Sequence, residues 1–218
     1  MSENRIAKHA TIGLLTILLV SSVMAENGTV NVLTLPDFSD WSTKKFSGET
    51  SYELVSMDDR LAIKAVSDSS ASGMIREIKV DLTKTPYLNW SWKVDSTLGD
   101  RDETKKSGDD YAARVYVVIS GGIFFWRTRA INYTWASVHA KGSSWPNPYT
   151  GNVVMVAVDS GQEYAGQWVT RRRNVLEDLK KLHGIDKTHI DAVAIMTDTD
   201  NSNKSATAYY GDIYFTED

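Results

Sequence analysis

Apolar and polar residues alternate with a period of two along much of this chain, and this pattern limits the folds that the chain can adopt. Leu88 to Val94 places leucine, two tryptophans and valine on one side, and 113–119 and 131–135 repeat the pattern. Successive side chains of a strand point to opposite faces, so the alternation predicts half-buried strands. We expect nine or ten strands in all. Further candidate strands lie near 61–66, 74–82, 154–158, 190–197 and 206–215.

Short segments rich in glycine, proline and asparagine separate these candidate strands. Ser107-Gly108, Gly121-Gly122 and the segment Pro146 to Pro148 are clear turn signals. A parallel α/β architecture would need helical patterns between the strands, and these are lacking. The sequence therefore predicts an all-β fold, an antiparallel β-sandwich of the galactose-binding-like jelly-roll type, with one short helix.

That helix is predicted to begin after Asn174, which can cap it, and to end at Gly184. Apolar residues recur between them at three- and four-residue spacing. Arg171 to Arg173 precede the helix, where positive charge is unfavourable against the helix dipole. Two interpretations stay open. Arg171, Arg172 and Arg173 meet acidic partners or a ligand, or they are solvated surface residues.

The first residues have the order typical of an export signal. Arg5 and Lys8 form a positive region, 12–20 is almost wholly apolar, and Val23 and Ala25 are small residues at the expected cleavage positions. We expect a cleaved signal peptide at 1–25 and a periplasmic or secreted protein. An uncleaved anchor is the alternative, although the apolar stretch is shorter than the ~20 residues of a comfortable span.

Length, charge and cysteine content limit what the rest of the chain can be. The 218 residues leave 26–218 as a single β-sandwich domain after cleavage. The cysteine count is zero, so the domain must be held by packing, or by a metal. The net charge is −4, whereas a nucleic-acid-binding protein usually carries an excess of basic residues. No later stretch is apolar and long enough to cross a membrane.

Aromatic residues give the first indication of a ligand. The chain has seven tryptophans and ten tyrosines. Trp126, Trp145 and Trp168 lie near predicted turns, where an indole offers the flat apolar face and polar edge that suit stacking on a sugar ring. The alternative is that these rings close the ends of the sandwich.

Polar residues at the start of one predicted strand form the second candidate site. Asp109 and Asp110 directly precede the strand that carries Arg114, after a long polar loop. Residues at strand ends are held by the scaffold and still reach solvent. Arg114 can form a bidentate fork with the carboxylate of an acidic sugar, or a cross-strand salt bridge with Asp198 or Asp212.

Catalytic signatures are few. The chain lacks a cysteine nucleophile, a His-x-x-x-His pair, a Gly-x-Ser-x-Gly elbow and a phosphate loop. Two carboxylates suffice for a glycosidase, so Asp109 or Asp110 with Arg114 keeps an enzyme among the hypotheses. We favour a protein without catalytic activity and assign no catalytic residue.

Several motifs in order resemble the uncharacterised bacterial family DUF3047. The resemblance covers nearly all of the expected mature chain. The segments that carry it are 86–94, 108–117, 147–152, 172–175, 194–201 and 208–213. Its layout is similar to carbohydrate-binding modules, in which acidic residues near the first strand and on the last strand can hold a structural calcium. Asp37, Asp40 and Asp212 are the positions that match.

Three hypotheses for function follow. The first is an exported module that recognises a carbohydrate or cell-envelope glycan. The second is a structural or assembly partner in the periplasm, which needs only an exposed edge or patch. The third, which has least support, is a glycan-cleaving enzyme. A fold does not decide among them, so the arrangement of the side chains must.

Overall fold

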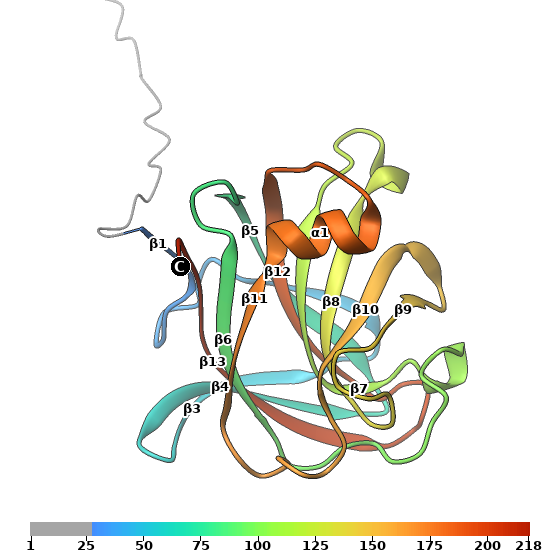
Figure 1. Ribbon diagram of the computed structural model, residues 1–218. Coiled ribbons are helices and arrows are strands. Elements are labelled where there is room, and N and C mark those ends of the chain that lie inside the picture. The colour runs from blue at the N-terminus through green and yellow to red at the C-terminus, as the bar shows by residue number, and fades with distance from the viewer. Residues whose placement is uncertain (1–27) are drawn as a thin grey trace, which may run out of the picture.

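The computed structural model describes residues 28–218, which form a sandwich of two β-sheets with one α-helix (Figure 1). The predicted signal peptide at 1–25 lies outside the described residues. The jelly-roll prediction is confirmed: strand dominates the described chain, and strands far apart in sequence pair within both sheets. Within the described part, no helix is long and apolar enough to cross a membrane.

The first sheet has six strands and is built around β13. Its order is β11-β6-β13-β4-β3, and β1 also pairs with β13. The strands are β1 (Thr29–Leu33), β3 (Ser51–Met57), β4 (Arg60–Asp68), β6 (Tyr87–Val94), β11 (Val169–Asn174) and β13 (Ser205–Thr216).

The second sheet has seven strands in the order β2-β5-β12-β7-β8-β10-β9. The strands are β2 (Ser42–Ser47), β5 (Ala71–Asp81), β7 (Tyr111–Ile119), β8 (Arg129–Ala136), β9 (Ser144–Asn147), β10 (Thr150–Ser160) and β12 (His189–Asp198). The helical segments are η1 (Lys106–Gly108), η2 (Phe125–Arg127) and α1 (Val175–His183).

One pairing departs from the antiparallel pattern. β10 runs parallel to β8, with Val154 opposite Ile131 and Val156 opposite Tyr133. The chain between them returns along β9, which pairs antiparallel with β10. A connection that carries its own strand therefore permits the parallel pair without a crossover helix.

The core lies between the sheets, and the alternation predicted most of it. Trp90, Trp92, Val115, Val117 and Val156 are all buried, as expected. Ala194, predicted to be inside, is only half-buried and lies outside the main core. Its neighbours in β12 are the core residues, namely Val193 and Ile195.

Aromatic side chains join the two sheets. The rings of Trp90 and Tyr133 stack with centroids 5.5 Å apart. Trp92 Nε1 donates to Asp159 Oδ2 at 2.8 Å, and Arg171 binds both oxygens of the same carboxylate through Nε. These donors satisfy the hydrogen-bonding capacity of the buried carboxylate, so the polar contact does not weaken the core.

The predicted helix is confirmed together with both of its ends. The Asn174 side chain accepts from the Glu177 backbone N–H at 3.1 Å, and Gly184 adopts the left-handed conformation that ends α1. The described residues contain thirteen strands, more than the sequence predicted. The clearest missed case is β2, in which every residue is exposed, so it shows no alternation of apolar and polar residues.

Candidate functional site

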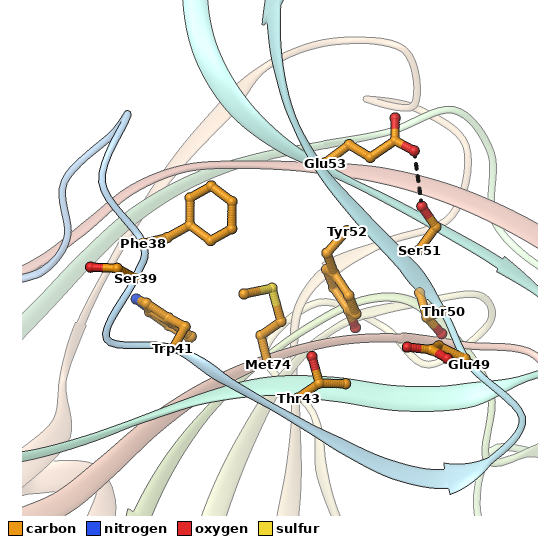
Figure 2. Close-up of a pocket in the computed structure, with 10 residues that line it drawn as sticks. All are labelled: Phe38, Ser39, Trp41, Thr43, Glu49, Thr50, Ser51, Tyr52, Glu53 and Met74. Atoms are coloured by element: carbon orange, nitrogen blue, oxygen red, sulfur yellow. Dashed lines mark hydrogen bonds between the residues drawn. The ribbon is translucent and has the colours of Figure 1, made fainter.

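Two of the cavities in the described structure are candidates for a small-ligand site. The first, of about 630 Å³, opens where β2 and β3 separate, and we call it the edge cavity. Figure 2 shows Phe38 and Trp41 on one side of it, Tyr52 on the other and Met74 between them. Its polar groups are mostly used inside the protein, since Tyr52 Oη donates to the Ser72 carbonyl at 2.7 Å. Trp41 is only 9% exposed, so its ring offers a ligand little surface.

The second cavity, of about 320 Å³, is the outer-face cavity. It lies on the face of the seven-stranded sheet that points away from the core, because its strand residues alternate with core residues. Strand and loop side chains from five parts of the chain meet there. They are Phe46, Ser47, Ala71, Asp109, Arg114, Tyr116, Asn147, Tyr149, Val153, Met196, Asp198, Asp200 and Asn201.

Arg114 stands at the centre of the outer-face cavity and is almost fully buried. Its Nη2 donates to Asp198 Oδ2 at 2.5 Å and to the Asp109 carbonyl at 2.6 Å, and its Nη1 donates to Tyr116 Oη at 2.9 Å. The guanidinium also lies over the Tyr111 ring, 4.2 Å from its centroid. The predicted salt bridge with Asp198 is confirmed, so both terminal nitrogens are engaged by protein groups.

The two carboxylates that precede β7 reach different partners around this arginine. Asn147 Nδ2 donates to Asp109 Oδ2 at 3.1 Å. Asp110 Oδ1 accepts from the backbone and side-chain nitrogens of Asn201, at 3.1 and 3.2 Å. The loop before β7, the turn between β9 and β10 and the loop after β12 are thereby joined around one cavity.

Several buried polar atoms around the cavity have no hydrogen-bond partner. The described residues contain seven such side-chain atoms, and three of them belong to Asp109 (Oδ1), Asp110 (Oδ2) and Arg114 (Nε). A buried polar atom that lacks a partner is costly, and natural proteins contain few. The three atoms are shielded from solvent, so this cost falls within the buried network around Arg114, in which Asp109 Oδ1 lies 3.7 Å from Arg114 Nη2.

Burial and negative charge change the acid–base properties of this site. Burial raises the pKa of Asp198 well above its usual range, although the Arg114 charge opposes the shift. Burial also raises the pKa of Asp109, and burial with the nearby Asp110 charge raises that of Asp200. Burial raises the pKa of Tyr116 to about 12. One guanidinium thus faces four carboxyl groups in a partly shielded site.

Two exposed rings stand at the rim of the outer-face cavity. Phe46 is 64% exposed and Tyr149 is 55% exposed. Tyr149 Oη donates to Asn201 Oδ1 at 2.7 Å, and the Lys106 amine lies 5.0 Å from its ring centroid. These contacts hold the Tyr149 ring in place beside the buried polar groups.

The three predicted ligand-binding tryptophans do not line the outer-face cavity. Trp145 is buried, stacks on His139 with centroids 4.1 Å apart and donates to the Glu103 carbonyl. Trp168 donates to Asp58 Oδ2 at 3.1 Å and lies beneath Arg60. Trp126 is 57% exposed, on η2. The structure therefore separates these rings from Asp109, Asp110 and Arg114.

The arginines before α1 also find partners within the protein. Arg173 forms a two-pronged pair with Asp178, at 2.9 and 2.5 Å. Arg172 is exposed and lies 3.8 Å from the centroid of the Tyr87 ring. Both residues are on β11, in the other sheet from Arg114.

The three predicted calcium ligands have different partners. Asp37 Oδ1 accepts from Ser39, Asp40 pairs with Arg76 at 3.0 Å and Asp212 accepts from the Leu35 backbone. Among residues 28–218, the one group of three side chains with the spacing of metal ligands is Asp110, Asp198 and Asp200, in or beside the outer-face cavity. Calcium binding stays a prediction.

The sequence predicts a site at Asp109, Asp110 and Arg114 but not most of the residues that surround them in the cavity. Phe46 comes from a strand without apolar alternation, and Asn147 and Tyr149 come from a turn. The Asn-Pro-Tyr sequence was the available signal, because asparagine before proline often starts a turn that presents its side chains. Pairing between distant strands, which brings Phe46 to Arg114, left no local signal.

The structure is similar to the family 30 carbohydrate-binding module of a cellulosomal cellulase of Clostridium thermocellum, with a TM-score of 0.50 and 10% identity. The match covers 87% of this chain and 98% of that module. At this identity the likeness shows the fold alone: a β-sandwich of the carbohydrate-binding-module type.

The chain belongs to the DUF3047 family, described as proteins of unknown function, whose profile matches residues 39–214. The family 11 module of cellulase Lic26A-Cel5E from C. thermocellum is also similar, with 12% identity, coverage of 89% and 97%, and a TM-score of 0.48. A further match is the xyloglucanase domain of NopAA from Sinorhizobium fredii, in complex with cellobiose. It shows 11% identity, coverage of 89% and 99%, and a TM-score of 0.46. No curated protein sequence matches.

Proposed function

We propose that this protein is a carbohydrate-binding module whose ligand occupies the outer-face cavity. The observation that carries the proposal is the combination of polar side chains in the cavity lining with exposed rings at its rim. Asn147, Asp200 and Asn201 line the cavity and are only half-buried, while Phe46 and Tyr149 present rings at the rim. A sugar hydroxyl donates and accepts at once, and the apolar face of a sugar ring stacks on an aromatic ring.

The charge of the cavity favours a neutral sugar. Asp109, Asp198 and Asp200 line it with Arg114, and Asp110 lies beside it. Both terminal nitrogens of Arg114 already bind protein groups, so little remains for a second carboxylate. An acidic sugar would bring another negative charge into a partly shielded site, which is unfavourable. We therefore favour a neutral glycan over the acidic sugar considered from the sequence.

Export would place this site among the glycans of the cell envelope or its surroundings. That part of the proposal rests on the signal-peptide pattern at 1–25. It is tested by measuring the intact mass of the protein recovered from the periplasm or medium of its host. Loss of residues 1–25 is the expected result.

The carbohydrate proposal is tested by screening the purified protein on a glycan array, followed by calorimetry with the best neutral oligosaccharide. Tyr149→Ala removes the stacking ring and is expected to weaken binding about tenfold. Asn147→Ala removes the donor that positions Asp109 and should also weaken binding. Leu54→Ala is the matched control, because Leu54 is 39% exposed and lies on β3, in the other sheet.

Two results would overturn the proposal. One is that no glycan binds the correctly folded protein. The other is that a glycan binds with equal affinity to the wild type, to Tyr149→Ala and to Asn147→Ala, because the ligand would then bind elsewhere.

A further inference from the structure

The loop between β7 and β8 presents apolar side chains to solvent. The sequence Ile-Phe-Phe-Trp occupies 123–126. Ile123 is 86% exposed, which is the highest value for any large hydrophobic residue described, and Phe124 and Trp126 are 41% and 57% exposed. Ile123, Phe124 and Trp126 form what we call the apolar tip. A group of exposed apolar side chains on a protruding loop marks an interaction surface.

The apolar tip is held in place by the loop that carries it. Arg127 N donates to the Phe124 carbonyl at 2.8 Å, and Asn152 Nδ2 donates to the Trp126 carbonyl at 2.8 Å. The rings of Phe124 and Trp126 meet edge to face, with centroids 5.3 Å apart. Gly121 permits the turn, because a Cβ there would lie 2.2 Å from the Phe124 carbonyl oxygen. These contacts keep the exposed rings together.

Positive charge gathers behind the apolar tip. Arg127 and Arg129 follow it directly, and Lys180 and Lys181 are exposed in the last turn of α1. His183 Nε2 lies 3.0 Å from the Ala130 carbonyl, which brings the end of α1 beside the start of β8. Figure 1 shows the η2 loop and α1 at the same end of the sandwich.

These cations are available to a partner. Arg127, Arg129, Lys180 and Lys181 form no ion pair with a carboxylate of the described chain, although the protein as a whole carries a net charge of −4. Unpaired cations that surround an exposed apolar loop complement a surface whose charge is negative and whose interior is apolar.

We propose that this end of the sandwich binds the surface of a membrane that contains anionic lipids. Ile123, Phe124 and Trp126 insert at the boundary between headgroups and acyl chains, while the arginines and lysines lie against the lipid phosphates. Interfacial segments combine aromatic and aliphatic side chains with basic residues in this way. Ile123 distinguishes the arrangement from a sugar platform, because a branched aliphatic side chain offers no flat ring for stacking.

The proposal is tested by co-sedimentation of the protein with vesicles. Vesicles of phosphatidylglycerol and phosphatidylethanolamine are compared with vesicles of phosphatidylcholine alone, at low and high salt. The wild type is expected to sediment with the anionic vesicles, and less so at high salt, since salt screens the lysine and arginine charges. Ile123→Ser with Phe124→Ser should lower the partition coefficient by more than about tenfold.

Matched variants separate lipid binding from a loss of folding. Leu61→Ser removes an equally exposed apolar side chain elsewhere, since Leu61 is 41% exposed on β4, and should sediment like the wild type. Lys180→Gln with Lys181→Gln should weaken binding to anionic vesicles only. Circular dichroism confirms that each variant is folded.

Three outcomes would overturn the proposal. The first is that the wild type fails to sediment with anionic vesicles, and the second is that the Ile123 and Phe124 double variant sediments as the wild type does. The third is that the double variant abolishes a concentration-dependent dimer in solution, without any effect on vesicle binding. That result would assign the apolar tip to contact with a second copy of the chain.

Discussion

Arg114 Nη2 lies 2.5 Å from Asp198 Oδ2, and both side chains are almost completely shielded from solvent. Such a pair contributes little net stability when it is intact, because both groups lost their hydration on folding. Loss of the pair is strongly destabilising, since removal of one partner leaves the other charge buried and uncompensated. The pair therefore fixes the floor of the outer-face cavity and makes the domain sensitive to change there.

Arg114→Met is expected to lower the free energy of unfolding by about 3–5 kcal/mol. Methionine fills similar space but leaves Asp198 without its counter-charge. Urea denaturation followed by tryptophan fluorescence measures the change. Arg172→Met is the control, because Arg172 is exposed and stacks on Tyr87 without an ion pair. A similar small decrease in the free energy of unfolding of both variants would show that breaking the buried pair is not especially destabilising.

The cost of Arg114→Met should depend on pH. Burial raises the folded-state pKa of Asp198, and Arg114 opposes the shift. Without Arg114 that pKa rises further, so the folded variant takes up a proton as the pH falls towards the unfolded-state pKa of about 4. The stability difference from the wild type should therefore shrink as the pH falls from neutral towards that value. Adding Asp198→Asn should abolish this pH dependence. A stability difference that stays constant with pH would contradict the inference that Asp198 takes up the proton.

Trp92→Ala should cost about 3–5 kcal/mol, the range for truncation of a buried aromatic ring. Trp92 is fully buried and packs at the centre of the core. Trp92→Phe separates packing from the polar contact, since it keeps a ring and loses the donor to Asp159. Arg171 still binds Asp159, so we expect a smaller loss, about 1–3 kcal/mol. Equal losses from the two variants would mean that the hydrogen bond dominates.

Glu103→Ala should loosen the loop that leads to Asp109. Glu103 is fully buried, and its carboxylate accepts from Ser137 N at 2.6 Å and from His139 N at 3.2 Å. Removal of the carboxylate frees both amides, so hydrogen exchange measured by mass spectrometry should accelerate there and across 97–108. Glu177→Ala, at an exposed position on α1, is the control. Unchanged exchange in Glu103→Ala would show that other contacts hold the loop.

Much of the fold could be predicted because its signals are local. Trp90 and Trp92 alternate with polar residues, Asn174 caps a helix and Gly184 ends it, and each of these patterns is read within a few residues. β2 and β9 carry no such pattern. Their position depends on pairing with β5 and β10, so sequence periodicity could not find them.

The candidate site divides in the same way. Asp109, Asp110 and Arg114 could be predicted because they cluster within six positions at the start of one strand. Asp198 was already one of two proposed partners for Arg114. Phe46 could not be predicted, because its approach to Arg114 depends on the order of strands in the sheet. Tyr149 had only the Asn-Pro-Tyr turn signal, which does not show what the turn lies beside. The prediction that Trp145 binds a ligand rested on its position near a turn, and that position does not reveal that the ring is buried.

The place of β13 has a consequence for how the protein is made. This strand lies between β4 and β6 and also pairs with β1, yet it comes after every other strand in the chain. During synthesis β1 and one edge each of β4 and β6 must wait for their common neighbour, although β3 can already pair with β4 and β11 with β6. The nascent chain therefore stays incompletely folded until β13 emerges from the ribosome.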